Sequence, residues 1–100
     1  MSKYLKAHYE NLMLQAQTAA ESKFSATFVT SSKNVLLLRE KSPRLTRQPF
    51  LTMKVNLHDM HFHDGRYDMS FDSAVEDFKG CVENSSFNPQ FDTPAIKGGK

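Results

Sequence analysis

The chain is poor in the residues that stabilise small secreted domains and in the long apolar runs of membrane proteins. Its 100 residues include one cysteine, Cys81, and no tryptophan. A single cysteine excludes an internal disulfide framework and fits a reducing compartment or a thiol buried as a small apolar side chain. No apolar run approaches the about 20 residues that cross a bilayer, and the amino terminus lacks a signal-peptide core. We therefore expect a cytoplasmic protein, in the host cytoplasm or the virion if the origin is viral.

Sequence patterns of enzymes are also missing. No serine occupies a nucleophile elbow, and the chain has no glycine-rich phosphate loop. Cys81 is expected on the apolar face of a helix, where a buried, unreactive thiol is the usual role. We therefore expect no catalytic residues, no cofactor and no small-molecule substrate.

The residues that are present suit one globular domain. The chain is 39% hydrophobic and 24% charged, which is ordinary for a soluble folded protein. A domain of this size can bury one modest core without metal or disulfides. Beyond Asn84, Asn-Pro, Thr-Pro and Gly-Gly pairs replace any helical or strand period. We predict a single α+β domain at 1–84 and an extended tail at 85–100.

The first segment, from Ser2 to about Lys23, has the period of a helix. Ser2 is placed to cap it, and charged residues fall opposite an apolar stripe. Leu14 alone lies on the charged side and is expected to be exposed. The stripe consists of Leu5, Tyr9, Leu12, Ala16 and Ala19.

Four strands are expected to follow. Residues 24–28 alternate between apolar and polar, which is typical of a half-buried strand. Residues 35–38 are apolar at every position, which indicates a central strand covered on both faces. A third strand begins at Phe50 and alternates through Leu57.

The segment from His58 to Asp68 holds three of the four histidines and three aspartates. The alternation slips at His58-Asp59, and a β-bulge would absorb the extra residue. Asp64-Gly65 suits the positive φ angles of a type I′ turn. We therefore predict a hairpin closed at Asp64-Gly65, with the fourth strand after it.

Three potential metal ligands would converge on one face of that hairpin. His61 and His63 share a strand face, and Asp68 would lie opposite His61. Zinc takes three or four such groups, and a His–Asp pair can also respond to pH. An exposed polar hairpin face produces the same pattern, and we favour it. A metal site at His61, His63 and Asp68 stays as an alternative.

A second helix is predicted from about Ser70 to Asn84, because Ser73 and Glu76 match a capping box. The order α-β-β-β-β-α predicts an α+β fold in two layers. It would comprise an N-terminal helix, a four-stranded antiparallel meander and a C-terminal helix, with both helices covering the apolar face of the sheet.

Charge is distributed unevenly along the chain. Residues 1–54 carry nine Lys and Arg against three acids, whereas residues 55–100 carry four against eight. The excess is greatest in a proline-bounded stretch that we expect to be an exposed loop. The candidate partner-binding cations are Lys33, Arg39, Lys41, Arg44, Arg47 and Lys54.

These features favour a small non-enzymatic protein-binding module. The basic loop would meet an acidic partner or a second copy, and the tail would present Phe87 and Phe91 as an extended arm. The general character suits a virus- or mobile-element-encoded inhibitor or an assembly subunit. The alternative is a nucleic-acid-binding protein whose 33–54 segment contacts phosphates. The acidic second half and the lack of aromatic residues within the basic stretch count against it.

Overall fold

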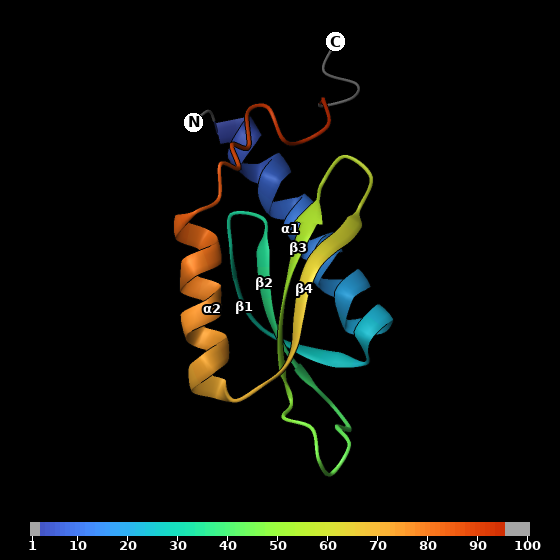
Figure 1. Ribbon diagram of the computed structural model, residues 1–100. Helices are drawn as coiled ribbons and strands as arrows, with labels where there is room; N and C mark the ends of the chain where they lie inside the picture. The colour runs from blue at the N-terminus through green and yellow to red at the C-terminus, as the bar shows by residue number, and fades with distance from the viewer. Residues whose placement is uncertain (1–2, 96–100) are drawn as a thin grey trace.

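The computed structural model describes residues 3–95 and has the predicted element order. The four strands form one antiparallel sheet in the order β1-β2-β3-β4. The α+β fold class is confirmed: an N-terminal helix, a four-stranded antiparallel meander and a C-terminal helix (Figure 1). The elements are α1 (Lys3–Phe24), β1 (Ala26–Ser32), β2 (Val35–Glu40), β3 (Phe50–Asn56), β4 (His61–Met69) and α2 (Phe71–Glu83).

The main core lies between its two principal layers, α1 and one face of the sheet. Leu36 and Leu38 of β2 are paired with Met53 and Leu51 of β3, and all four side chains are buried. They share one face because alternate strand residues point the same way. From α1 the same core receives Leu12, Met13, Ala16 and Ala20. The central residues of the predicted apolar stripe, Leu12 and Ala16, are therefore buried as expected, whereas Ala19 is exposed.

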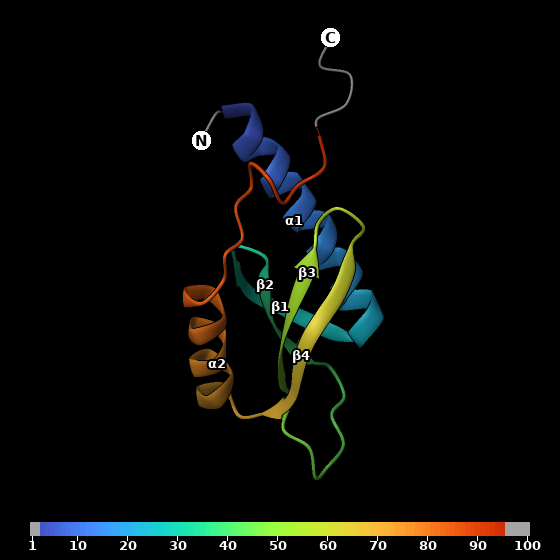
Figure 2. The ribbon, with the colours of Figure 1, turned by 45° about the horizontal axis from the view of Figure 1, so that its top comes forward.

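The second helix lies on the opposite face of β2 and β3. Val35 and Leu37 of β2 point to that face and are buried, and the Thr52 hydroxyl of β3 donates to Asp77 of α2 at 2.5 Å. β2 is thus covered on both sides, as its unbroken apolar run indicated. We expected both helices to cover the same face of the sheet. Instead, α1 covers one face and α2 lies on the other (Figure 2).

We predicted a bulge at His58-Asp59 and a turn at Asp64-Gly65, and the structure has these two features in the opposite order. β4 runs without a break from His61 to Met69, so the hairpin closed at Asp64-Gly65 is wrong. The chain reverses just before β4 instead. There the side chains of Asn56 and Asp59 accept hydrogen bonds from the backbone N–H groups of the residues two positions ahead, a geometry that favours turns over strand pairing.

Asp64-Gly65 forms a β-bulge. The register passes from Lys54 opposite His63 to Thr52 opposite Arg66, so two residues of β4 face one residue of β3. Asp64 has a φ of 54°. A Cβ at Gly65 would lie 2.5 Å from Cε of Met53, so Gly65 leaves the space that this buried side chain fills. The positive φ and missing side chain that suit a turn suit a bulge equally.

The strand β1 begins later than predicted. Phe24 is the last residue of α1, and Ser25 leaves the helix with a φ of 49°. The Phe24 ring nevertheless packs against the core and meets Phe62 of β4 edge-on, with centroids 5.6 Å apart. Its place in the alternating pattern reflected burial and not strand geometry.

The segment after α2 folds back over the domain. Phe87 packs against Tyr9 of α1, with ring centroids 5.6 Å apart, and Nε2 of His8 lies 2.7 Å from the carbonyl oxygen of Pro94. The division into a domain at 1–84 and a tail at 85–100 stays a prediction, and residues 96–100 lie outside the described residues. Neither helix found in residues 3–95 is long and apolar enough to cross a membrane.

Because β2 is buried on both faces, substitutions in it should affect stability strongly. Leu38 has no exposed surface, whereas 58% of Leu14 is exposed. We expect Leu38→Ala to lower the free energy of unfolding by about 2–5 kcal/mol, because it leaves a cavity between α1 and the sheet. Leu14→Ala should change that free energy by less than about 0.5 kcal/mol. Urea unfolding followed by circular dichroism measures both, and equal effects would contradict the assigned core.

Candidate functional site

The three candidate metal ligands do not converge. His61 and His63 lie near the start of β4, with parallel rings whose centroids are 6.4 Å apart. Asp68 lies near the other end of β4, where its carboxylate accepts the backbone N–H of Gln48 at 2.6 Å. The predicted His61–Asp68 pairing is wrong because it required a turn at residues 64–65. Across residues 3–95, no three His, Cys, Asp or Glu side chains are grouped to hold a metal ion.

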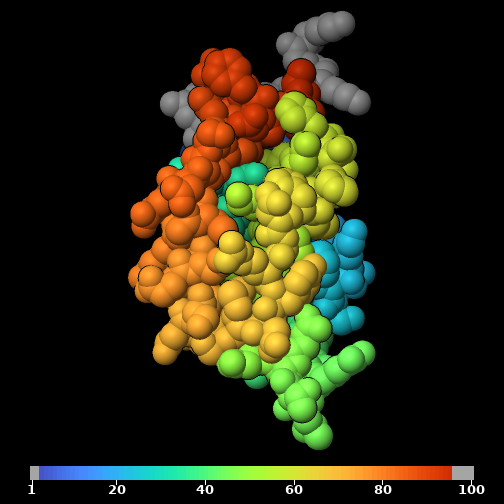
Figure 3. Space-filling model, in the orientation of Figure 1, coloured from blue at the N-terminus to red at the C-terminus, as the bar shows by residue number. Residues whose placement is uncertain are grey.

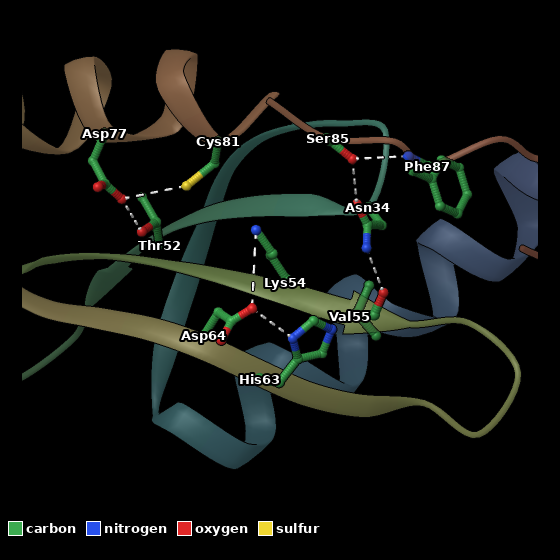
Figure 4. A network of polar contacts seen from close by, with 10 residues as sticks. All are labelled: Asn34, Thr52, Lys54, Val55, His63, Asp64, Asp77, Cys81, Ser85 and Phe87. Atoms are coloured by element: carbon green, nitrogen blue, oxygen red, sulfur yellow. Dashed lines mark hydrogen bonds and ion pairs between the residues drawn. The ribbon is translucent and has the colours of Figure 1, made fainter. Parts of the chain in front are cut away.

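His63 has Asp64 and Lys54 as its neighbours instead (Figure 4). Nδ1 of His63 lies 3.0 Å from Oδ2 of Asp64, and the same oxygen lies 3.9 Å from Nζ of Lys54. The bulge brings this carboxylate between the two side chains. Lys54 and His63 also line an open polar pocket of about 330 Å³ at the end of the sheet, beyond α2. The pocket is thus the place where the histidine segment meets other elements.

Three of the six candidate cations take part in the fold. Nζ of Lys33 donates to the carbonyl oxygens of Val82 at 2.9 Å and Ser85 at 3.2 Å. These carbonyls lie in the last turn of α2 and just after it, where a cation is favoured by the helix dipole. Lys54 lies under α2 beside Asp64. Arg47 forms a 3.0 Å ion pair with Glu40 and stands over the Tyr67 ring.

The remaining three cations, Arg39, Lys41 and Arg44, are exposed. They lie at or near the loop of residues 41–49, which projects from the end of the molecule away from the tail (Figure 3). Leu45 in this loop is fully exposed. A single exposed leucine is ordinary, whereas exposed apolar surface that extends over several residues marks binding sites.

The base of the loop is fixed to the sheet and carries further exposed apolar surface. The backbone N–H of Glu40 donates to the carbonyl of Pro49 at 2.7 Å. Tyr67 and Phe71 lie beside the base, and their exposed fractions are 44% and 52%. We refer to these residues together as the loop end: Arg39, Lys41, Arg44, Leu45, Arg47, Tyr67 and Phe71.

The two phenylalanines of the tail have different surroundings. Phe87 is half-buried against Tyr9, so it contributes to the fold. Phe91 is 69% exposed, although its carbonyl oxygen lies 3.3 Å from Nε2 of His58. Phe91 is therefore the exposed candidate of the tail, at the opposite end of the molecule from the loop.

Cys81 is half-buried on α2 and its thiol donates to Oδ2 of Asp77 at 3.8 Å. Burial raises the pKa of the Cys81 thiol, and the negative charge of Asp77 raises it further. The same carboxylate accepts from Thr52 and pairs with Arg66 at 3.3 Å. A thiol with a raised pKa is a poor nucleophile at neutral pH, which agrees with the unreactive role expected for Cys81.

The sequence reasoning missed Leu45 and the pocket. Leu45 stands as a lone apolar residue within Ser-Pro-Arg-Leu-Thr-Arg, and that pattern was the available signal. The pocket had no such signal, because its walls come from distant segments. No protein-family model, curated protein or solved structure matches the chain.

The assignment of Lys33 to the fold is testable. Lys33→Met keeps the side-chain length but removes the donor to Val82 and Ser85. We expect it to lower the free energy of unfolding by about 1 kcal/mol or more and to speed hydrogen exchange in residues 84–93. Lys41→Met at an exposed position is the matched control and should change neither. Unaltered exchange in Lys33→Met would refute the structural role.

Proposed function

We propose that the protein is a non-enzymatic protein-binding module that docks on an acidic, partly apolar protein surface through the loop end. The observation that carries the proposal is the full exposure of Leu45 on a projecting loop beside Lys41 and Arg44. An exposed leucine side chain contributes no burial free energy to the fold. Inserting that side chain into a pocket of a partner would remove it from water and so favour binding. The flanking cations would match acidic groups on the partner and select the orientation.

A protein partner fits the loop end better than a nucleic acid does. Binding to a phosphate backbone needs several free cations along a continuous track. Lys33 is bonded to the end of α2, Lys54 lies beside Asp64 away from the loop, and Arg47 is paired with Glu40. The exposed surface that remains mixes apolar and cationic groups, with Tyr67 and Phe71 beside the loop base. Aromatic and arginine residues of this kind are enriched at the energetic centres of protein interfaces.

The anchoring of the loop favours an inhibitor or an assembly subunit. The loop base is held by backbone and side-chain hydrogen bonds to Pro49 and Asp68, so its position is set before binding. A preorganised loop loses less conformational entropy on docking than a flexible arm. Phe91, at the opposite end of the molecule, would belong to a second contact in an assembly.

The test compares co-purification from the native host with three forms of the protein. Wild type and Leu14→Ser should retain one specific partner with acidic surface, and Leu45→Ser should lose it. Loss of a central apolar anchor typically weakens binding by about 2 kcal/mol or more, close to thirtyfold. Leu14 is the matched control because it is an exposed leucine on α1. Equal recovery with Leu45→Ser would refute docking through the loop end.

Salt titration of binding to generic DNA and RNA separates the nucleic-acid alternative. Phosphate-backbone binding weakens steeply with salt, so the proposal expects no salt-sensitive binding at physiological ionic strength. Tight binding that falls with salt, and that Arg44→Glu abolishes, would replace the protein partner with a nucleic acid.

A further inference from the structure

We propose that the polar pocket between the end of the sheet and the tail binds a small ligand bearing an oxyanion, a carboxylate or a phosphate. The pocket measures about 330 Å³, which lies at the lower end of the range for small-molecule sites. It lies at the opposite end of the molecule from the loop end, so this inference is independent of the proposed protein partner.

The first support is the state of Lys54. Lys54 lines the pocket, 29% of its side-chain surface is exposed, and Oδ2 of Asp64 lies 3.9 Å from its Nζ. That separation exceeds hydrogen-bonding distance. Within residues 3–95, Nζ of Lys54 forms no hydrogen bond to protein. No buried side-chain nitrogen or oxygen in the described residues lacks a hydrogen-bond partner, so Nζ of Lys54 is reached by water. An oxygen of a bound anion would replace that water with a charge-assisted hydrogen bond.

The second support is the supply of further donors around Lys54. Nδ1 of His63 lies against Asp64, and Nε2 has no partner in the described part of the chain. Nε2 can donate to an anion only in the protonated ring, because a neutral ring that donates from Nδ1 leaves Nε2 as an acceptor. The hydroxyl of Ser86 and the side-chain amide of Asn84 also line the pocket, and neither is hydrogen-bonded to protein within residues 3–95. Four groups from three parts of the chain, namely β3, β4 and the segment after α2, thus line one space.

The third consideration is the negative groups near the pocket, each of which already accepts a hydrogen bond or lies beside a cation. Asp92 at the rim accepts the backbone N–H of Asn88 at 2.7 Å. The carbonyls at the end of α2 would repel an anion, but Lys33 donates to those of Val82 and Ser85. Asp64 and Asp92 both remain negatively charged competitors, and a ligand oxygen would take the place of Asp64 beside Lys54.

The tail forms one wall of the pocket and is itself held in place. Ser85 donates to Asn34 at 3.3 Å and accepts the backbone N–H of Phe87 at 3.1 Å, and Asn34 donates to the carbonyl of Val55 at 3.0 Å (Figure 4). This chain of bonds joins the tail to β3. A bound ligand would bridge the same two elements, so occupancy should also slow hydrogen exchange in residues 84–93.

The experiment titrates inorganic phosphate and acetate, separately, into the full chain and follows backbone amide NMR shifts. We expect a saturable response at Lys54, His63 and Ser86 with a dissociation constant of about 1 mM or below for at least one anion. A response to phosphate alone identifies a phosphorylated ligand, and a response to acetate alone identifies a carboxylate. No saturable response to either anion would overturn the proposal.

Three variants test the residues. Lys54→Gln should weaken binding at least tenfold, because it removes a charged hydrogen bond. Asp64→Asn should strengthen binding, since it removes the competing carboxylate, and this gain remains informative if Lys54→Gln fails to fold. His61→Gln is the matched control, because His61 is on the same strand outside the pocket lining, and it should bind as wild type does. Affinity that is unchanged in Asp64→Asn and in a folded Lys54→Gln would overturn the assignment.

Discussion

The burial of β2 on both of its faces is the constraint on which the rest of the structure depends. Four successive apolar residues, 35–38, put two side chains on each side of one strand. The α1 helix covers one side, and only a second helix on the opposite side removes Val35 and Leu37 from water. Each fully buried leucine contributes about 1.5–3 kcal/mol relative to exposure. Two helices on opposite faces of a four-stranded sheet satisfy that requirement.

The position of α2 determines which polar groups become structural. Because α2 lies over β2 and β3, Thr52 is buried and its hydroxyl donates to Asp77 of α2 instead of to solvent. Lys33, at the turn between β1 and β2, then reaches the end of α2. Cations that look equivalent in the sequence are thereby divided into those that hold the fold and those that remain free. The free ones gather around the projecting loop, which is why the loop end carries the proposed function.

Local patterns predicted the elements, whereas their placement depended on contacts between distant residues. The helical stripe through Leu12 and the apolar run at 35–38 each report burial directly, and both predictions were confirmed. Asp64-Gly65 failed as a predictor because a positive φ and an absent side chain suit a bulge as well as a turn. Only the fit of Gly65 against Met53 of the neighbouring strand separates the two. The pocket was invisible for the same reason, since Lys54 and Ser86 are adjacent only in the folded chain.

Native-state hydrogen exchange of the backbone amides tests the central claim most directly. If β2 is enclosed by both helices, the amides of residues 36–38 should exchange only through global unfolding, with the highest protection in the chain. The amides on the outer side of β4, an edge strand with two residues of positive φ, Asp64 and Asp68, should exchange through smaller openings. Protection of β2 that is no higher than that of β4 would contradict the account.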